Sequence, residues 1–199
     1  MQGKSARALL YAPARGRQEV PTRVTVRKAH GFALIDMIFV CGVLGILFSI
    51  AMPSLFTAKQ SAAAASAIGS LRAINSAQLT YALTCGAGFY SPSLSRLGTN
   101  PPGSSVSFIG SGLGSADTVT KSSYVIQLTA TPFPGAPSSC NGAAAGEDGQ
   151  GFKAAADPNV PGNSRFLATN ANNMIFEHTA TLWVAMPEFG EPVVGHVLR

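Results

Sequence analysis

The hydrophobic pattern of the chain is dominated by one apolar run, residues 32–56. This run contains 14 Leu, Ile, Val or Phe residues and a single charge, Asp36, which lies near its beginning. A helix rises about 1.5 Å per residue, so the run would span roughly 37 Å, more than the ~30 Å hydrocarbon core of a bilayer. Its apolar side chains outweigh the cost of one carboxylate close to an end. The pattern therefore predicts a transmembrane helix over residues 32–56.

Beyond this run the pattern becomes Ala-rich and amphipathic. Between Ala64 and Ala82, apolar residues recur at the three- and four-residue spacing of a helix with one buried face. Pro53 lacks a backbone N–H donor and is expected to bend the helix near its position. We therefore expect one long helix over residues 33–84. Its second half, in the segment 57–85, is expected to pack on a globular head.

Residues 86–199 have the short alternating segments and the Gly- and Pro-rich spacers of a β-rich head. Four segments have strand-like composition: Tyr124–Thr129, 165–169, 174–178 and Thr181–Met186. The second and third flank an Asn-rich turn and predict a hairpin. The spacers Gly98–Ser115 and Pro132–Gly151 are expected to be surface loops. The predicted fold class is α+β, with a long N-terminal helix packed on a small antiparallel sheet.

Positive charge is concentrated at the N-terminus. Residues 1–31 contain seven Lys or Arg and one acid, which gives +6, whereas residues 32–199 contain seven Lys or Arg and eight acids, which gives −1. A near-neutral body lacks the electrostatic footprint of phosphate binding, so no nucleic-acid partner is expected. Three basic residues lie just before the apolar run and only Lys59 lies shortly after it. This bias predicts a cytoplasmic N-terminus and a head outside the membrane.

The junction between the basic leader and the apolar run carries the most specific motif. Lys28-Ala29-His30-Gly31 is followed directly by Phe32-Ala33-Leu34-Ile35-Asp36. A conventional secretory signal, cleaved near Ser49–Ala51, and an unprocessed membrane anchor are the alternatives. The motif resembles the prepilin processing site of type IV pilins and type II secretion pseudopilins. The resemblance extends to about Phe56 and includes Gly45 and Pro53, which occupy positions where the family places Gly and Pro.

The resemblance implies a processed and polymerising protein. A prepilin peptidase would cut after Gly31 and methylate the new N-terminal amine of Phe32. The fifth mature residue of the family is usually Glu, and here it is Asp36. Its carboxylate would pair with the Phe32 amine of a neighbouring subunit and set the axial register. The alternative is that Asp36 only snorkels from the end of the helix.

The predicted function is thus a structural subunit of a type IV pilus-like filament, which polymerises through its N-terminal helix. The alternatives are a pseudopilin of a type II secretion system and a minor or tip pilin that acts as an adhesin. The implied partners are the prepilin peptidase, copies of the chain and other pilins, the filament assembly machinery of the inner membrane, and membrane lipid before assembly. The implied location is the inner membrane, in a single pass, and then an extracellular or periplasmic filament.

The three cysteines divide between two environments. Cys41 lies in the predicted span, whereas Cys85 and Cys140 lie in the exported part, where disulfides form. A Cys85–Cys140 disulfide is therefore predicted, and two free or buried thiols are the alternative.

Nothing in the sequence indicates catalysis. No zinc-ligand spacing, phosphate loop or nucleophile motif is present. We expect neither an enzyme nor a bound cofactor. Because secretion pseudopilins often bind calcium in C-terminal loops, the resemblance makes Glu147, Asp148 and Asp157 calcium candidates. Their spacing does not match an EF-hand, and a solvated acidic loop is the alternative.

Overall fold

The computed structural model describes residues 34–198. Within this part of the chain, residues 34–45 and residues 46–198 form two units. The predicted long helix is confirmed as α1, Leu34–Thr84, with 51 residues. It is continuous through Pro53, whose carbonyl oxygen accepts a hydrogen bond from the Thr57 hydroxyl (2.8 Å).

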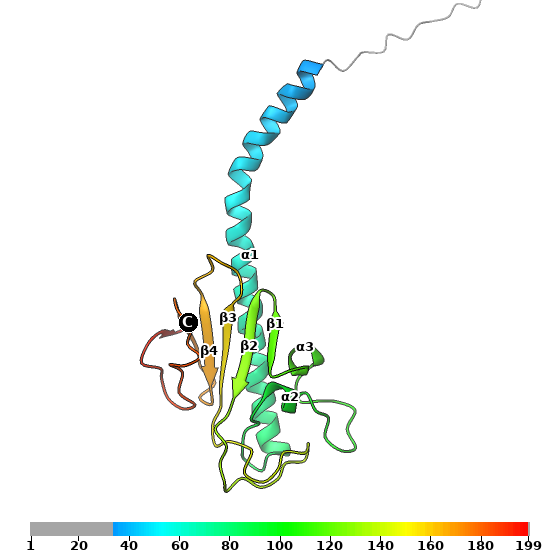
Figure 1. Ribbon diagram of the computed structural model, residues 1–199, viewed down its shortest axis with the longest axis vertical. Coiled ribbons are helices and arrows are strands. Elements are labelled where there is room, and N and C mark those ends of the chain that lie inside the picture. Colours follow the sequence, from blue (N-terminus) through cyan, green and yellow to red (C-terminus); the bar gives the residue numbers. More distant parts are fainter. Residues whose placement is uncertain (1–33, 199) are drawn as a thin grey trace, which may run out of the picture. The chain divides into compact units, whose positions relative to one another are not determined.

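The strands of the head form one antiparallel sheet in which β1 to β6 lie side by side in chain order. Figure 1 shows the first four of them, β1 to β4. Their bounds are β1 Thr118–Lys121, β2 Tyr124–Thr129, β3 Lys153–Pro158, β4 Phe166–Asn170, β5 Ile175–His178 and β6 His196–Val197. Two single-turn helices, α2 (Leu94–Leu97) and α3 (Ser111–Gly114), precede the sheet. The fold is therefore α+β with a pilin-like layout, as predicted.

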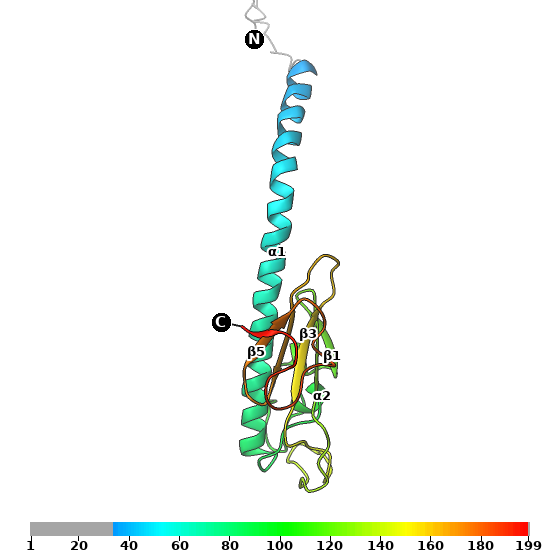
Figure 2. The ribbon, with the colours of Figure 1, turned by 90° about the vertical axis from the view of Figure 1, so that its left-hand side faces the viewer.

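One face of the sheet packs on the second half of α1, and Figure 2 shows the two lying alongside each other. The contacting stripe of α1 runs from Ala64 through Leu71 and Ile74 to Tyr81, all fully buried. Such three- and four-residue spacing places side chains on a single helix face. On the sheet, side chains of β2 alternate between the two faces, and Tyr124, Ile126 and Leu128 point toward the helix. This core confirms the predicted amphipathic half of the helix.

Strand β3 occupies the centre of this packing although its sequence is not typical of a strand. It pairs with β2 (Ile126↔Ala156) and with β4 (Ala156↔Leu167). Its alanines, Ala154, Ala155 and Ala156, are fully buried. Small side chains at the centre of the sheet leave room for the helix to approach on one face.

The other face of the sheet is covered by the C-terminal segment, residues 179–195. Leu182 and Met186 pack there against Phe176 and its neighbours. The predicted strand Thr181–Met186 is therefore wrong, because this segment forms a turn closed by a hydrogen bond from Met186 N–H to Leu182 O (2.8 Å). The apolar residues at 182, 184 and 186 suit a strand face, yet Val184 is 83% exposed while the two outer residues are buried.

Candidate assembly helix and the disulfide-linked end of the head

The first half of α1 is an apolar surface without cover in the described part of the chain. Every residue from Leu34 to Lys59 is exposed, and the large apolar side chains range from 43% exposed at Val43 to 77% at Leu34. This helix is long and apolar enough to cross a membrane. Burial of one such side chain stabilises by about 1.5–3 kcal/mol. The segment is therefore expected to lie in lipid or against apolar helices.

Asp36 lies in the first turn of α1 and is exposed. A carboxylate there interacts favourably with the positive end of the helix dipole. Gly31 and Phe32 lie outside the described residues. The predicted cleavage, methylation and pairing with Asp36 thus stay predictions.

Small residues follow one face of this helix, at Cys41, Gly45 and Ser49. A Cβ atom added at Gly42 or Gly45 would meet nothing within 4 Å. Packing within the chain therefore does not require these glycines, although each costs about 1 kcal/mol of helix stability relative to Ala. Small residues at four-residue spacing allow close approach of another helix in an apolar environment.

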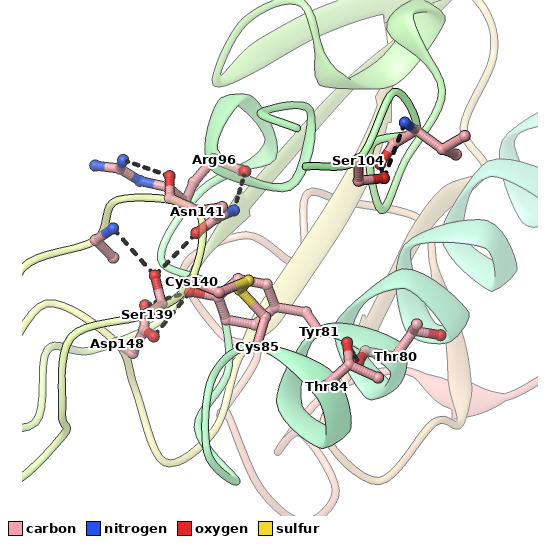
Figure 3. Close-up of a disulfide and its surroundings, with 12 residues drawn as sticks. Thr80, Tyr81, Thr84, Cys85, Arg96, Ser104, Ser139, Cys140, Asn141 and Asp148 are labelled. Carbon is pink, nitrogen blue, oxygen red and sulfur yellow. Dashed lines mark hydrogen bonds between the residues drawn. A yellow bond between two sulfur atoms is a disulfide. The ribbon is translucent and has the colours of Figure 1, made fainter. Parts of the chain in front are cut away.

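The other end of α1 is covalently tied to the head (Figure 3). Cys85, directly after the helix, forms the predicted disulfide with Cys140, with the two Cα atoms 5.0 Å apart. Cys140 lies in the segment Pro132–Gly151, expected to be a surface loop. That expectation holds only in part, because Asn141 and Asp148 of this segment are buried.

Asp148 is fully buried beside the disulfide and bonds to the last turn of α1. The Tyr81 hydroxyl donates toward both carboxylate oxygens, at 2.8 and 3.1 Å. Burial raises the pKa of Asp148, and it also raises the pKa of Tyr81 well above its usual range. This pair closes a contact between residues 67 positions apart. Tyr81 precedes Cys85 by four residues, which places it about one helical turn before the disulfide.

Arg96 of α2 provides a second set of contacts to the same segment. Its guanidinium lies 3.6 Å from Glu147, and its carbonyl oxygen accepts a hydrogen bond from the Asn141 side chain (2.7 Å). Arg96, Glu147 and Asp117 line a polar cleft of about 620 Å³. Ser95 bonds to Asp117 and lowers the pKa of that carboxyl. The cleft holds charged groups that are already paired or hydrogen-bonded.

The three calcium candidates serve separate contacts. Glu147 pairs with Arg96, Asp148 bonds to Tyr81, and Asp157 on β3 accepts a hydrogen bond from the Thr181 hydroxyl (2.7 Å). Burial raises the pKa of Asp157. Among residues 34–198, no three His, Cys, Asp or Glu side chains gather in a group able to hold a metal ion.

Comparisons of the chain with protein-family models, curated proteins and solved structures find no match.

Proposed function

We propose that this chain is a structural subunit of a type IV pilus-like filament, inserted in the inner membrane, cut after Gly31 and polymerised through the first half of α1. The observation that carries the proposal is the contrast within this one helix. Residues 34–59 are exposed and almost wholly apolar, whereas Ala64 to Tyr81 form the core of a folded head. An apolar helical segment that continues into a folded head suits a molecule that is held in lipid and then packed against copies of itself.

The chemistry of assembly follows from the two ends of the apolar segment. Cleavage would remove seven of the 14 Lys and Arg residues, change the formal net charge from +5 to −1, and free the Phe32 amine. Asp36, four residues later, would receive that amine from a neighbouring subunit. An ion pair shielded from water is far stronger than one in water, and a carboxylate left without a partner in apolar surroundings is costly. The pair would therefore select the axial register in which the amine of one subunit meets the Asp36 carboxylate of its neighbour. The small residues on the same helix permit close packing.

The decisive experiment is mass spectrometry of the protein recovered from the membrane. The N-terminal peptide is expected to begin with N-methylated Phe32, because the junction matches the processing motif. A strain without prepilin peptidase activity is the control and should yield the uncut leader. A native protein that begins near Met52, or that retains residues 1–31 in a peptidase-competent strain, contradicts the proposal.

A further inference from the structure

A groove lies between α1 and the end of the sheet where β1 joins β2 and β3 joins β4. Its volume is about 180 Å³ and its walls are largely apolar. Phe56 and Ala63 of α1 form one wall, and Val160 and Pro161 of the β3–β4 loop form the other. Phe56 is 64% exposed and Val160 45% exposed, so the described chain leaves this apolar surface open.

The walls of the groove are held in place by hydrogen bonds. The Asn159 N–H donates to the Ser123 carbonyl (2.8 Å), which ties the β3–β4 loop to the β1–β2 turn. The Ser66 hydroxyl on α1 donates to Ser122 in the same turn (2.8 Å). The groove is thus formed before any ligand binds, so binding does not have to cost the entropy of ordering these loops.

One cation lines the groove, and no acid does. Lys59 is part of its wall, and Lys121 stands at the start of the β1–β2 turn. Both are exposed, and within residues 34–198 neither takes part in a salt bridge. A free positive charge beside an apolar wall is complementary to an anionic, amphipathic ligand.

The position of the groove along α1 indicates which amphipathic ligand it meets. Phe56 ends the apolar run, so it lies at the exported boundary of the hydrocarbon core when that run spans a bilayer. Lys59 and Ala63 are about 4.5 and 10.5 Å farther along the axis. The headgroup layer on each side of a bilayer is roughly 5–7 Å thick. The groove therefore begins within this layer, at Lys59, and extends beyond its outer edge, at Ala63.

We propose that the groove is a membrane-contact surface that receives an anionic phospholipid. The headgroup would meet Lys59 and Lys121, and the glycerol and upper acyl region would meet Val160 and Pro161. The inference rests on the proposed function, because it requires the first half of α1 to be in the membrane before assembly. Its consequence is that the head lies against the bilayer surface in a fixed orientation.

Nitroxide labels on the full chain test this contact. The chain, with Cys41→Ala, is reconstituted in vesicles of equal phosphatidylcholine and phosphatidylglycerol, and labels are placed by Leu47→Cys, Val160→Cys or Val184→Cys. Accessibility to a water-soluble nickel reagent is compared with accessibility to oxygen. The label at Val160 should be several-fold less accessible to nickel than the label at Val184. The label at Leu47 should be reached by oxygen alone.

Each contrary result has its own meaning. If Leu47 is shielded and Val160 is as accessible to nickel as Val184, the groove contact is overturned while the proposed function stands. If Leu47 itself is reached by nickel, both are overturned. Shielding of Val160 that grows with the ratio of protein to lipid assigns the groove to a second copy of the chain and overturns the lipid assignment.

Charge reversal tests the choice of an anionic headgroup. In the double variant Lys59→Glu and Lys121→Glu, nickel accessibility at Val160 should rise toward that at Val184, while Leu47 stays shielded. The unaltered lysines should also protect Val160 less in vesicles of phosphatidylcholine alone. Equal protection in both kinds of vesicle overturns the anionic assignment.

Discussion

Asp36 is the single charge in an otherwise apolar helical segment, and its removal separates insertion from assembly. Asp36→Ala should insert at least as well as the native chain, because a carboxylate opposes insertion by up to about 3 kcal/mol. Filament yield should fall about tenfold or more, because the proposed pairing would leave the Phe32 amine of the neighbouring subunit without its partner. Recovery of filaments sheared from cells gives the yield.

A matched control keeps the charge at this position. Asp36→Glu retains the carboxylate, and Glu is the residue usual in the resembling family, so filament yield should be preserved. Normal yield from Asp36→Ala would remove the assigned role in register. Loss of yield in both variants would point to a steric effect.

A second prediction at the residue scale concerns Asp148 and the dependence of stability on pH. Its pKa is raised in the folded head because burial disfavours the charged form. Its contribution to stability is therefore greatest below its ordinary pKa near 4 and decreases as pH rises through the raised value. Asp148→Asn keeps an acceptor for the Tyr81 hydroxyl and removes this titration. Relative to native protein, the melting temperature of Asp148→Asn should rise between about pH 4 and pH 7.

Asp117 provides a control of opposite sign. The Ser95 side chain lowers its pKa, so this carboxylate stabilises the head above its ordinary pKa and the stabilisation is lost as pH falls. Asp117→Asn should therefore be less stable than native protein at pH 7, and the difference should shrink in acid. Parallel pH profiles for Asp148→Asn and the native chain would show that Asp148 is not the titrating group.

At the scale of elements, the Cys85–Cys140 disulfide fixes the end of α1 to the long loop between β2 and β3. The bridged residues are 55 positions apart, and closing such a loop removes about 4 kcal/mol of chain entropy from the unfolded state. Replacing both cysteines by Ala should lower the free energy of unfolding of the head by that order, measured by urea denaturation in detergent. Cys41→Ala, at an exposed free cysteine, should leave it unchanged.

Elements with a clean period were predictable from the sequence, and those stabilised by their neighbours were not. Helix α1 and strand β2 have regular spacing and match the prediction. Strand β3 is a run of alanines with low strand propensity, and it is a strand because β2 and β4 pair with it on both sides. The strand predicted over Thr181–Met186 was wrong because apolar residues two positions apart suit either a strand or a turn whose middle residue is exposed.

The features of the candidate site also differ in whether the sequence could predict them. The disulfide followed from the compartments of the three cysteines, which needs no geometry. By contrast, the Tyr81–Asp148 pair joins residues 67 positions apart. No local spacing encodes such a contact, since it arises only when the loop folds back on the helix. The groove beside Phe56 likewise depends on two loops that meet in space.

At the scale of the whole molecule, the proposed function predicts a particular place in a filament. A principal subunit should dominate filaments sheared from the cell surface, and deletion of its gene should abolish surface fibres. Quantitative mass spectrometry of the sheared preparation and electron microscopy of the deletion strain measure these outcomes. Intact fibres with a loss of protein secretion would instead identify a secretion pseudopilus. A trace amount in otherwise normal fibres would indicate a tip subunit.

Because the six strands lie in chain order, the order in which they are synthesised is also the order in which the sheet can be built. Each strand after β1 arrives when its partner is already present, so few long-range searches are needed. The buried stripe of α1 from Ala64 to Tyr81 is synthesised first, before the sheet that covers it. The segment that carries Leu182 comes late and seals the outer face over Phe176. A chain cut off before residue 179 would expose this face of the sheet, because Leu182 and Met186 would no longer cover Phe176.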